Sequence, residues 1–543
     1  MSVRNGIALL IALSTLLFLA GCGSGSNSPA PVPPPSGNFS NANLNGTYVF
    51  SVSGTDSTGA PYAIVGTFTA NGSGGNGKGG ITGGTFDIND ADTSVFTSGP
   101  IADASINSNS YYSVSVDGRG EATIGSNISG FPNLTFDFVL STNSHGLITE
   151  FDTFGTGSGT LDLQAAGVTP TGPYAFSFSG GTYSGTPFAT VGNFALSGGA
   201  ITSGLADFNN GAVLISPGQT LGGTVVVAST PSTTLSTQQY PSLLFDVFAI
   251  SATQLKFIEM DTTATLSGDA FSQTSTTIPT GTLAFTLQGD LASDSPIAAG
   301  GFMVTDGTGD ITNASTEDFN IDGTLSPTTP VPFTASYLAA GTGRYTINTF
   351  SGFTPADSNL TYAAYPSSGG LLLLEIDTNG ITTGAAYTQS STTFAASQGY
   401  GLNLSGDNLS AASEVDDIAE FAANSTGNTI TGLIDENSTS AGPVTFGAAL
   451  TSGTYLAPVN GRGAIAATAG TSSSNTTLNG GFALTFYTVD GTTFPFIESD
   501  SGQVSAGVFV LQNPSASSPG LAHPNMFVVR PLIRPHTARQ KKN

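Results

Sequence analysis

The sequence is poor in the residues that build most catalytic and metal centres. Its 543 residues include one cysteine, three histidines and no tryptophan, and only 9 % are charged. One cysteine cannot form a disulfide within the chain, and with three histidines it cannot complete a zinc finger or an iron–sulfur centre. The 71 glycines follow no Gly-X-Y period, which excludes collagen.

Basic residues are also scarce. The chain has 11 Lys and Arg against 36 Asp and Glu, a formal net charge of −25. All the acids lie between Asp56 and Asp500, and the bases in that stretch are Lys78, Arg119, Lys256, Arg344 and Arg462. A body this acidic repels phosphate backbones, so we expect no nucleic-acid partner. The segment 513–543 carries bases and no acid, and we predict that it is a disordered basic tail.

The N-terminal segment reads as an export signal. Arg4 precedes an apolar run at 7–20, which is too short for an ordinary membrane span and ends in Leu19-Ala20-Gly21-Cys22. This ending resembles the lipobox of bacterial lipoproteins. The resemblance implies a signal peptide at 1–21, cleavage before Cys22, a diacylglycerol on its sulfur and an acyl chain on its amino group. Gly23 follows where Asp would favour inner-membrane retention, so the resemblance implies the outer membrane or cell surface.

The residues after Cys22 predict a tether. The segment 22–43 is rich in Gly and Ser and contains a proline run, a composition that gives a flexible and then extended chain. Several acyl chains on Cys22 would make a stable anchor, because each buried CH₂ contributes about 0.8 kcal/mol. We therefore expect a folded body held away from a membrane by a lipid and a tether.

A fourfold repeat fills most of the remaining chain. Its clearest marker is Glu-x-Asp followed by Gln, with the Gln 14 residues after the Glu in every copy. The copies run from Glu150 to Gln164, Glu259 to Gln273, Glu375 to Gln389 and Glu498 to Gln512. We predict four β-repeats at 44–165, 170–274, 279–390 and 394–512, each of domain length and longer than the usual solenoid repeat.

Inside each repeat the apolar period is two. Segments such as YVFSV at 48–52 and YAFSF at 174–178 alternate between turns rich in Gly, Asn, Asp and Ser, which is typical of strands. About eight strands of ordinary length fit in each repeat, and short turns make neighbouring strands antiparallel. We predict an all-β protein of four tandem antiparallel domains. An up-and-down barrel is favoured because closure removes exposed edges, and a β-sandwich is the alternative.

The order of the strand motifs resembles the small calycin-type barrels, the architecture of lipocalins and avidins. The Gly-x-Trp signature of lipocalins is missing, because the chain has no tryptophan. Over residues 44–512 the units also resemble the tandem all-β repeats of uncharacterised bacterial surface lipoproteins. That second resemblance implies no known activity.

The Glu-x-Asp pairs are the first candidate site. They are Glu150/Asp152, Glu259/Asp261, Glu375/Asp377 and Glu498/Asp500. Residues i and i+2 of a strand share a face, so the two carboxylates would lie about 6–7 Å apart. That separation suits an ion pair, a cation site or a glycosidase acid–base pair.

A structural interpretation, as an ion pair or a turn, is favoured, because a feature present four times is more typical of structure than of an active site. A Gly-Arg turn supplies a cation in three repeats, at Arg119, Arg344 and Arg462. We expect these arginines to pair with the Glu-x-Asp carboxylates and fix the strand register. The second repeat lacks the arginine and has Lys256 three residues before Glu259.

Asp-x-Asn also recurs, at Asp87/Asn89, Asp207/Asn209, Asp318/Asn320 and Asp435/Asn437. Such residues favour turns in which the side chain bonds its own backbone. In the third copy, Asp318, Asn320 and Asp322 with Gly323 resemble the start of an EF-hand or dockerin calcium loop. Position 12 of that loop is Thr329 instead of Glu, and no helices flank it. We expect no cofactor, with this incomplete calcium loop as the one metal candidate.

The sequence predicts a protein that is not an enzyme. The body has a single histidine, His145, in an expected turn, and no nucleophile elbow or P-loop is present. We expect a lipid-anchored envelope protein with a structural or adhesive role, a membrane contact through its lipid and an unknown extracellular ligand. The alternatives are a small-ligand carrier using barrel interiors and a polysaccharide hydrolase using Glu-x-Asp.

Overall fold

The computed structural model describes residues 37–515, apart from 76, 95, 98, 229, 349–359 and 470–480. Cys22 with the predicted lipobox, most of the tether and most of the basic tail lie outside the described residues. The described residues belong to one compact unit, Pro35–Asn543. Their only helix is a 3₁₀ turn at Asn41–Asn43, so none in the described part is long and apolar enough to cross a membrane.

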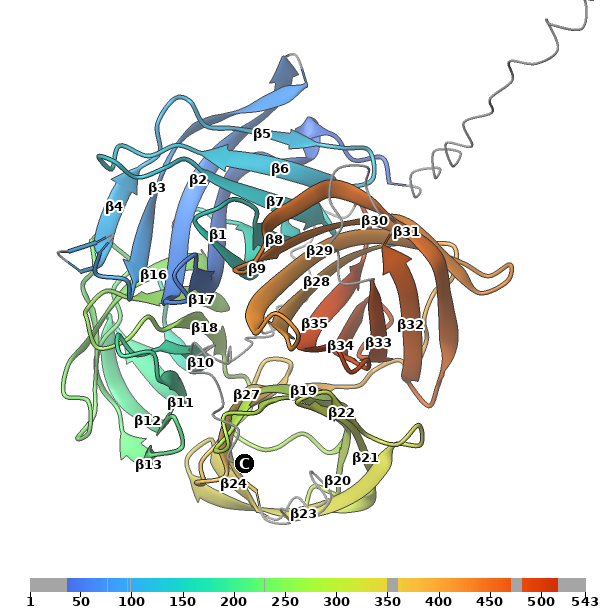
Figure 1. The fold of residues 1–543 in the computed structure, drawn as a ribbon. Helices are drawn as coiled ribbons and strands as arrows, with labels where there is room; N and C mark the ends of the chain where they lie inside the picture. Colours follow the sequence, from blue (N-terminus) through green and yellow to red (C-terminus); the bar gives the residue numbers. More distant parts are fainter. Residues whose placement is uncertain are drawn as a thin grey trace, which may run out of the picture. The chain divides into compact units, whose positions relative to one another are not determined.

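The described strands form four antiparallel barrels (Figure 1). Barrel 1 contains β1 (Asn45–Asp56), β2 (Pro61–Gly75), β3 (Lys78–Asp90), β4 (Ile101–Ser105), β5 (Tyr111–Val114), β6 (Arg119–Ile124), β7 (Leu134–Leu140), β8 (His145–Glu150) and β9 (Gly155–Leu163). Barrel 2 contains β10 (Gly172–Gly181), β11 (Pro187–Ser197), β12 (Ala200–Asn210), β13 (Leu214–Thr220), β14 (Gly222–Thr224), β15 (Thr233–Ser236), β16 (Leu243–Ser251), β17 (Gln254–Glu259) and β18 (Ser267–Ser272).

The third and fourth barrels follow the same plan. Barrel 3 contains β19 (Gly281–Leu291), β20 (Pro296–Thr305), β21 (Asp310–Ile321), β22 (Thr324–Leu325), β23 (Val331–Gly341), β24 (Arg344–Asn348), β25 (Thr361–Ser367), β26 (Gly370–Glu375) and β27 (Gly380–Thr388). Barrel 4 contains β28 (Gly399–Asn408), β29 (Ser413–Asn424), β30 (Thr429–Ser438), β31 (Gly442–Val459), β32 (Arg462–Ala469), β33 (Phe482–Tyr487), β34 (Thr493–Glu498) and β35 (Gln503–Leu511).

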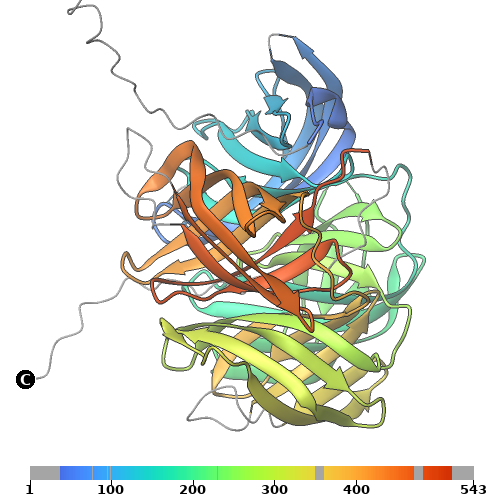
Figure 2. The same cartoon turned by 90° about the vertical axis from the view of Figure 1, so that its right-hand side faces the viewer.

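Each barrel closes through eight strands that run up and down in chain order. In the first three barrels the short strands β4, β13 and β22 are extra partners at the side of the ring, whereas barrel 4 has the single long strand β31 at that place. The ring closes where the first strand pairs with the last, as β1 does with β9 and β28 with β35. Figure 1 shows barrel 3 end-on, and Figure 2 shows its strands from the side. The predicted all-β class and barrel architecture are confirmed, and the sandwich alternative is wrong.

Successive side chains of a strand point alternately into the barrel and away from it, and in β10 the inward ones are large and the outward one is small. In β10, Tyr174, Phe176 and Phe178 point into the core of barrel 2, while Ala175 between them belongs to an apolar cluster outside it. An eight-stranded barrel is just wide enough for such side chains to fill it. The four barrels each have one interior cluster of this kind, rich in Phe, Tyr, Leu and Ile.

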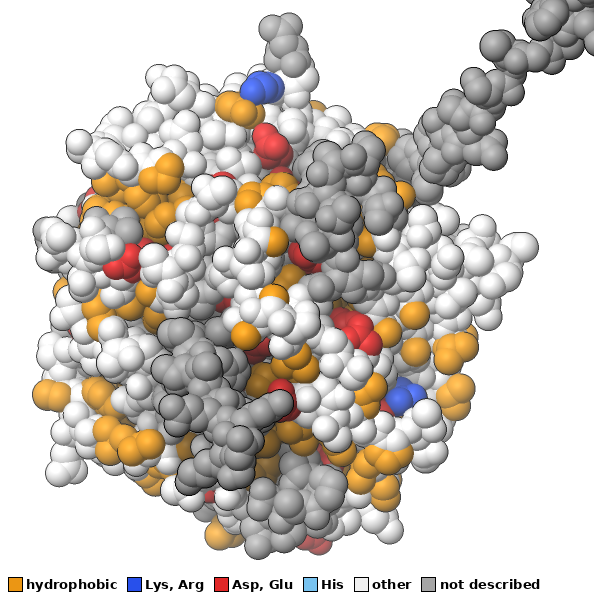
Figure 3. Space-filling view, in the orientation of Figure 1, with side chains coloured by type: hydrophobic (Ala, Val, Ile, Leu, Met, Phe, Trp, Pro, Cys, Tyr) orange, Lys and Arg blue, Asp and Glu red, His pale blue; other side chains and the backbone are white. Residues whose placement is uncertain are grey.

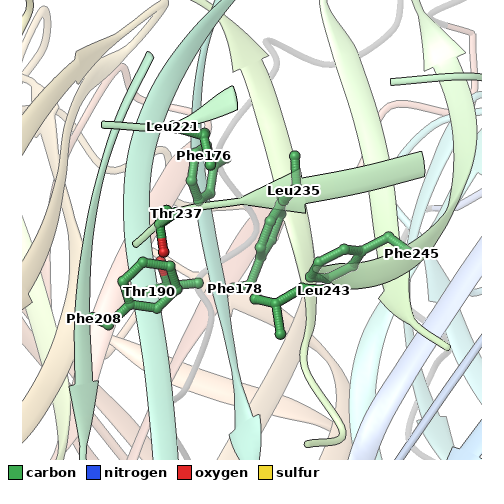
Figure 4. Close-up of a pocket in the computed structure, with 9 residues that line it drawn as sticks. All are labelled: Phe176, Phe178, Thr190, Phe208, Leu221, Leu235, Thr237, Leu243 and Phe245. Atoms are coloured by element: carbon green, nitrogen blue, oxygen red, sulfur yellow. The ribbon is translucent and has the colours of Figure 1, made fainter. Parts of the chain in front are cut away.

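The interior of barrel 2 contains a small cavity, shown in Figure 4. Aromatic and aliphatic side chains line it, among them Phe176, Phe178, Phe208 and Phe245. Its free space has room for one water molecule at most. A small organic ligand does not fit in that cavity, so it gives no support to the predicted carrier alternative.

Candidate functional site

The asparagine of each Asp-x-Asn motif binds the following barrel. In every copy its side-chain Nδ2 contacts two backbone carbonyls there, that of the Glu of Glu-x-Asp and that of the residue five positions later. The eight distances lie between 2.7 and 3.2 Å. In three copies Nδ2 also contacts the carbonyl of the Asp of Glu-x-Asp, at 2.8 to 3.4 Å. The donors and first acceptors are Asn89 to Glu259, Asn209 to Glu375, Asn320 to Glu498 and Asn437 to Glu150. The last of these joins barrel 4 to barrel 1, so the contacts run in a cycle.

The marker glutamine makes a second contact in the same direction. Its Nε2 donates to a carbonyl near the end of the third strand from last in the next barrel, at 2.8 to 3.0 Å. The pairs are Gln164 with Ala249, Gln273 with Pro366, Gln389 with Thr488 and Gln512 with Leu140. These four acceptors occupy one register position, because each lies four residues after the partner of a Glu-x-Asp glutamate. Two recurring motifs of the sequence therefore build the junctions between barrels.

The three arginines lie at these junctions and contact the aspartate of the preceding Asp-x-Asn motif. Arg344 binds Asp207 with Nε at 2.8 Å and Nη2 at 2.6 Å, and Arg462 binds Asp318 with Nε at 2.8 Å and Nη2 at 2.7 Å. Arg119 reaches Asp435 across the junction of barrels 4 and 1 at 3.1 Å. A bidentate arginine–carboxylate pair fixes orientation as well as charge. The structure thus places the arginines against other carboxylates than the Glu-x-Asp pairs expected from the sequence.

Tyrosine completes two of these ion pairs. Tyr365 donates a hydrogen bond to Asp207 beside Arg344, and Tyr487 donates one to Asp318 at 2.9 Å beside Arg462. The oxygens of Asp318 are thereby engaged with protein donors, and Asn320 faces barrel 4. Two of the three residues of the predicted calcium loop are therefore used in a junction. The third, Asp322, lies at a positive φ of 49° and is exposed.

The junction of barrels 1 and 2 lacks the arginine. Three carboxylates meet there instead: Asp87 and Asp103 of barrel 1 and Asp246 of barrel 2 each offer an oxygen within 4.8 Å of the others. Burial first, and then the Asp246 carboxyl, raise the pKa of Asp87 to about 9. Sequence reasoning missed Asp103 and Asp246. Register would have found Asp246, because it stands directly after Phe245, the residue paired with Glu259.

The Glu-x-Asp pairs are buried within the barrels. All four glutamates are 0 or 1 % exposed. Burial, followed by the charge of the neighbouring aspartate, raises the pKa of each glutamate well above its ordinary value. Burial therefore favours the neutral form of each glutamate, and a polysaccharide cannot reach it to be cleaved.

Each aspartate of these pairs, in contrast, caps a turn. Asp152 accepts hydrogen bonds from the backbone N–H groups of Thr135 and Phe154, at 2.6 and 2.7 Å. Asp261 and Asp377 accept equivalent pairs of bonds, and Asp500 accepts one from Gly502. The pair thus ties the end of one strand to the turn that follows it.

The remaining basic groups of the body are also engaged. Lys256 is 1 % exposed and its Nζ lies 3.0 Å from Asp269. His145 begins β8, and its Nδ1 lies 2.7 Å from Asp162. Because Arg119, Arg344 and Lys256 are buried, the face in Figure 3 carries few basic side chains.

No protein-family model and no curated protein matches the chain. Several solved structures are similar to it at low identity. They include a double mutant of transferrin binding protein B from Haemophilus parasuis Hp5, at 10 % identity, TM-score 0.17, 69 % of this chain and 85 % of that one. The isotype 1 transferrin binding protein B from serogroup B Neisseria meningitidis has 12 % identity and a TM-score of 0.19, over 68 % and 84 %. At such TM-scores these likenesses carry no argument about fold or function.

Proposed function

We propose that this chain is a lipid-anchored envelope protein whose four barrels act as one rigid body in a structural or adhesive role outside the cytoplasm. The observation that carries the proposal is the cycle of junctions. Asparagine and glutamine recur at equivalent positions in all four copies and donate to the next barrel.

Apolar contacts support the same proposal. Val49, Ala63 and Val65 of barrel 1 pack with Ile258 and Met260 of barrel 2 in one buried cluster. Similar clusters join barrels 2, 3 and 4, and barrels 4 and 1. Burial of apolar surface stabilises by about 25 cal/mol per Å², so the barrels hold together through packing as well as hydrogen bonds.

A role without catalysis is supported by where the acids lie. The Glu-x-Asp glutamates are out of reach of a substrate, and the single described histidine of the body pairs with Asp162. The acid–base chemistry of a polysaccharide hydrolase needs carboxyl groups that flank the scissile bond. The described residues offer no such arrangement among the four repeated pairs.

The anchor can be tested at Cys22. We expect the wild-type chain to incorporate a palmitate analogue and to sediment with membranes, and Cys22→Ala to do neither. Gly23→Ala is the matched control, because it changes the neighbouring residue and leaves the sulfur. A Cys22→Ala chain that still carries the label would overturn the lipid anchor, while the junctions would stand.

The rigid body can be tested by limited proteolysis of the full chain. We expect removal of the two ends to leave one resistant fragment that spans all four barrels. The linkers between barrels, such as 164–171 and 273–280, would stay uncut in the native protein. Release of single barrels under native conditions would contradict the proposal. Binding can then be sought with extracellular glycans and proteins on the intact fragment.

A further inference from the structure

In three of the four junctions an arginine pairs with the aspartate of Asp-x-Asn, and the first junction lacks this arginine. In barrels 1, 3 and 4 the residue paired with the glutamate is also paired, on the preceding strand, with Ala122, Ile347 or Ile465. An arginine lies three residues before each of these, at Arg119, Arg344 and Arg462. Continuing the β15–β16 register, in which Thr233 pairs with Phe245, places Thr230 at that position in barrel 2. Thr230 is exposed and uncharged. The guanidinium that would face Asp87 is therefore missing.

The carboxylate of Asp103 points to the position that an arginine guanidinium occupies in the other junctions. In barrels 2 and 4, glycines donate a backbone N–H to the junction aspartate: Gly218 to Asp207 at 2.8 Å, and Gly447 to Asp435. A Cβ added to either glycine would lie 3.6 or 3.5 Å from the arginine guanidinium. In barrel 1 the equivalent donor is Asp103, whose N–H reaches Asp87 at 2.7 Å.

The backbone at Asp103 keeps the glycine conformation. Its φ is +54°, close to the +61° of Gly218, in the left-handed region that favours glycine. The side chain that this backbone carries therefore leaves in the direction of the guanidinium in the other junctions. Barrel 1 thus has an acid where a positive charge lies elsewhere.

Asp87 has a buried oxygen that accepts no N–H or O–H from the described residues, and its carboxyl lies against that of Asp246. The residue is 1 % exposed, and its Oδ2 accepts no hydrogen bond from the described residues. Asp246 is also 1 % exposed, and the ion pairs of the described residues include none to Asp87, Asp103 or Asp246. Buried charges are expensive unless they are paired or bind a metal. A buried oxygen without an N–H or O–H donor and a vacant guanidinium position both call for a cation.

We propose that Asp87, Asp103 and Asp246 bind a calcium ion, which takes the place of the arginine and joins barrel 1 to barrel 2. Calcium prefers oxygen ligands at about 2.3–2.6 Å and accepts flexible geometry. Oxygens within 4.8 Å of one another can therefore surround it. Magnesium demands a tighter octahedron with oxygens at about 2.0–2.1 Å, so calcium binds more tightly here.

The test is calcium titration of the purified, chelator-treated full chain by calorimetry, with thermal unfolding in calcium and in EDTA. We expect one calcium per chain and a higher melting temperature in calcium, because a ligand that binds only the native state stabilises it. Asp103→Gly should weaken calcium binding by at least about tenfold, since even the loss of an outer partner of a metal ligand costs that much. This variant keeps the backbone seen at Gly218 and Gly447, so it should fold.

Asp322→Gly is the matched control. It too replaces an aspartate at positive φ by glycine, but in barrel 3 and within the calcium loop suggested by the sequence. We expect it to bind calcium as the wild type does, and Asp246→Asn to lose affinity as Asp103→Gly does. Absence of calcium binding in the wild type would overturn the proposal, and so would unchanged affinity in Asp103→Gly. The first result is expected if Asp87 and Asp246 share a proton and bind no cation.

Discussion

The first and fourth junctions each contain two aspartates at equivalent positions, but the fourth also has an arginine beside them. Asp87 faces Asp246 in the first, and Asp435 faces the equivalent Asp137 in the fourth, where Arg119 also lies. Burial raises the pKa of Asp435 to about 6 against the opposing effect of Arg119, whereas that of Asp87 rises to about 9. Burial also raises the pKa of Asp137 well above its ordinary value, so each junction contains one acid whose neutral form is strongly favoured, and Arg119 opposes the effect of burial on the other acid, Asp435.

The second and third junctions solve the same problem with fewer acids. At the position of Asp137 and Asp246 they have Ala363 and Thr485. One arginine then faces one junction aspartate, with a tyrosine as an additional donor. The comparison teaches that the polar frame of a junction is constant, while its charge balance is set separately at each one.

Removal of Arg344 should have the largest effect. Arg344→Met leaves Asp207, whose side chain is 0 % exposed, without its cation, and breaking a buried ion pair costs about 3–5 kcal/mol. Urea denaturation would measure the fall in unfolding free energy. Arg462→Met is the comparison, because the Arg462 side chain is 27 % exposed and water can compensate more of its loss. Equal losses in the two variants would contradict the argument from burial.

Loss of the asparagine contact should have the next largest effect. Asn437→Ala removes the donor from two buried carbonyls, those of Glu150 and Gly155, and an unsatisfied buried group costs about 1–3 kcal/mol. The fourth junction should then open first, as judged by faster amide hydrogen exchange in the strands that meet there. Asn437→Asp keeps the side-chain volume but cannot donate when ionised, so it should destabilise as well. A stable Asn437→Asp variant would show that packing, not hydrogen bonding, holds this contact.

Stability should fall as the pH rises. Burial, reinforced by Asp318 and Asp117 respectively, raises the pKa of Glu317 and of Glu420 to about 9. These folded-state pKa values exceed those of the unfolded chain, so the native state holds the protons more tightly. The contribution is complete below about pH 4.3 and is lost as pH rises towards 9.

Each of these carboxyls can change the unfolding free energy by at most about 1.4 kcal/mol per pH unit. Urea denaturation at a series of pH values in EDTA would measure the slope, with the double variant Glu317→Gln and Glu420→Gln as the control that should flatten it. A free energy of unfolding that rises between pH 5 and 9 would refute this account.

The smallest effect is expected from giving the first junction a missing donor. Phe248 occupies the register position of Tyr365 and Tyr487, three residues after the partner of the glutamate. Phe248→Tyr would place a hydroxyl near Asp87, and a hydrogen bond to a buried group contributes about 0.5–1.5 kcal/mol. Thermal unfolding in EDTA would detect the gain. The reverse change Tyr365→Phe should cost a similar amount, and a gain there would contradict the comparison.

The fold was predictable because its signals are local. Alternation in segments such as 174–178 and the fixed spacing from Glu to Gln predicted strands, their number of copies and closure into barrels. The junctions were not predictable in the same way. Asn437 and Gln512 were visible as repeated markers, but their acceptors are backbone carbonyls of another copy, which leave no mark in the sequence.

The arginines show why tandem repeats mislead. Arg344 lies in the same repeat as Glu375, so pairing within the repeat is the natural expectation. Its partner in the structure is Asp207 of the preceding repeat. Each repeat offers an equivalent set of acids, and sequence alone cannot tell which copy supplies the partner. Asp103 could not be singled out from the sequence either. Its equivalence to Gly218 and Gly447 becomes visible only in the structure, where all three donate a backbone N–H to the aspartate of Asp-x-Asn.

Because barrel 4 contacts barrel 1, the chain could begin at a different repeat and still form the same junctions. Asn43, just before barrel 1, contacts the carbonyl of Pro514, just after barrel 4, at 3.5 Å. Thr156 and Ser158 of barrel 1 both donate to Asp416 of barrel 4. The two ends of the folded body are thus neighbours, and any of the three remaining linkers could serve as a new start. A circularly permuted gene that begins at barrel 2, 3 or 4 would encode the same cycle of contacts.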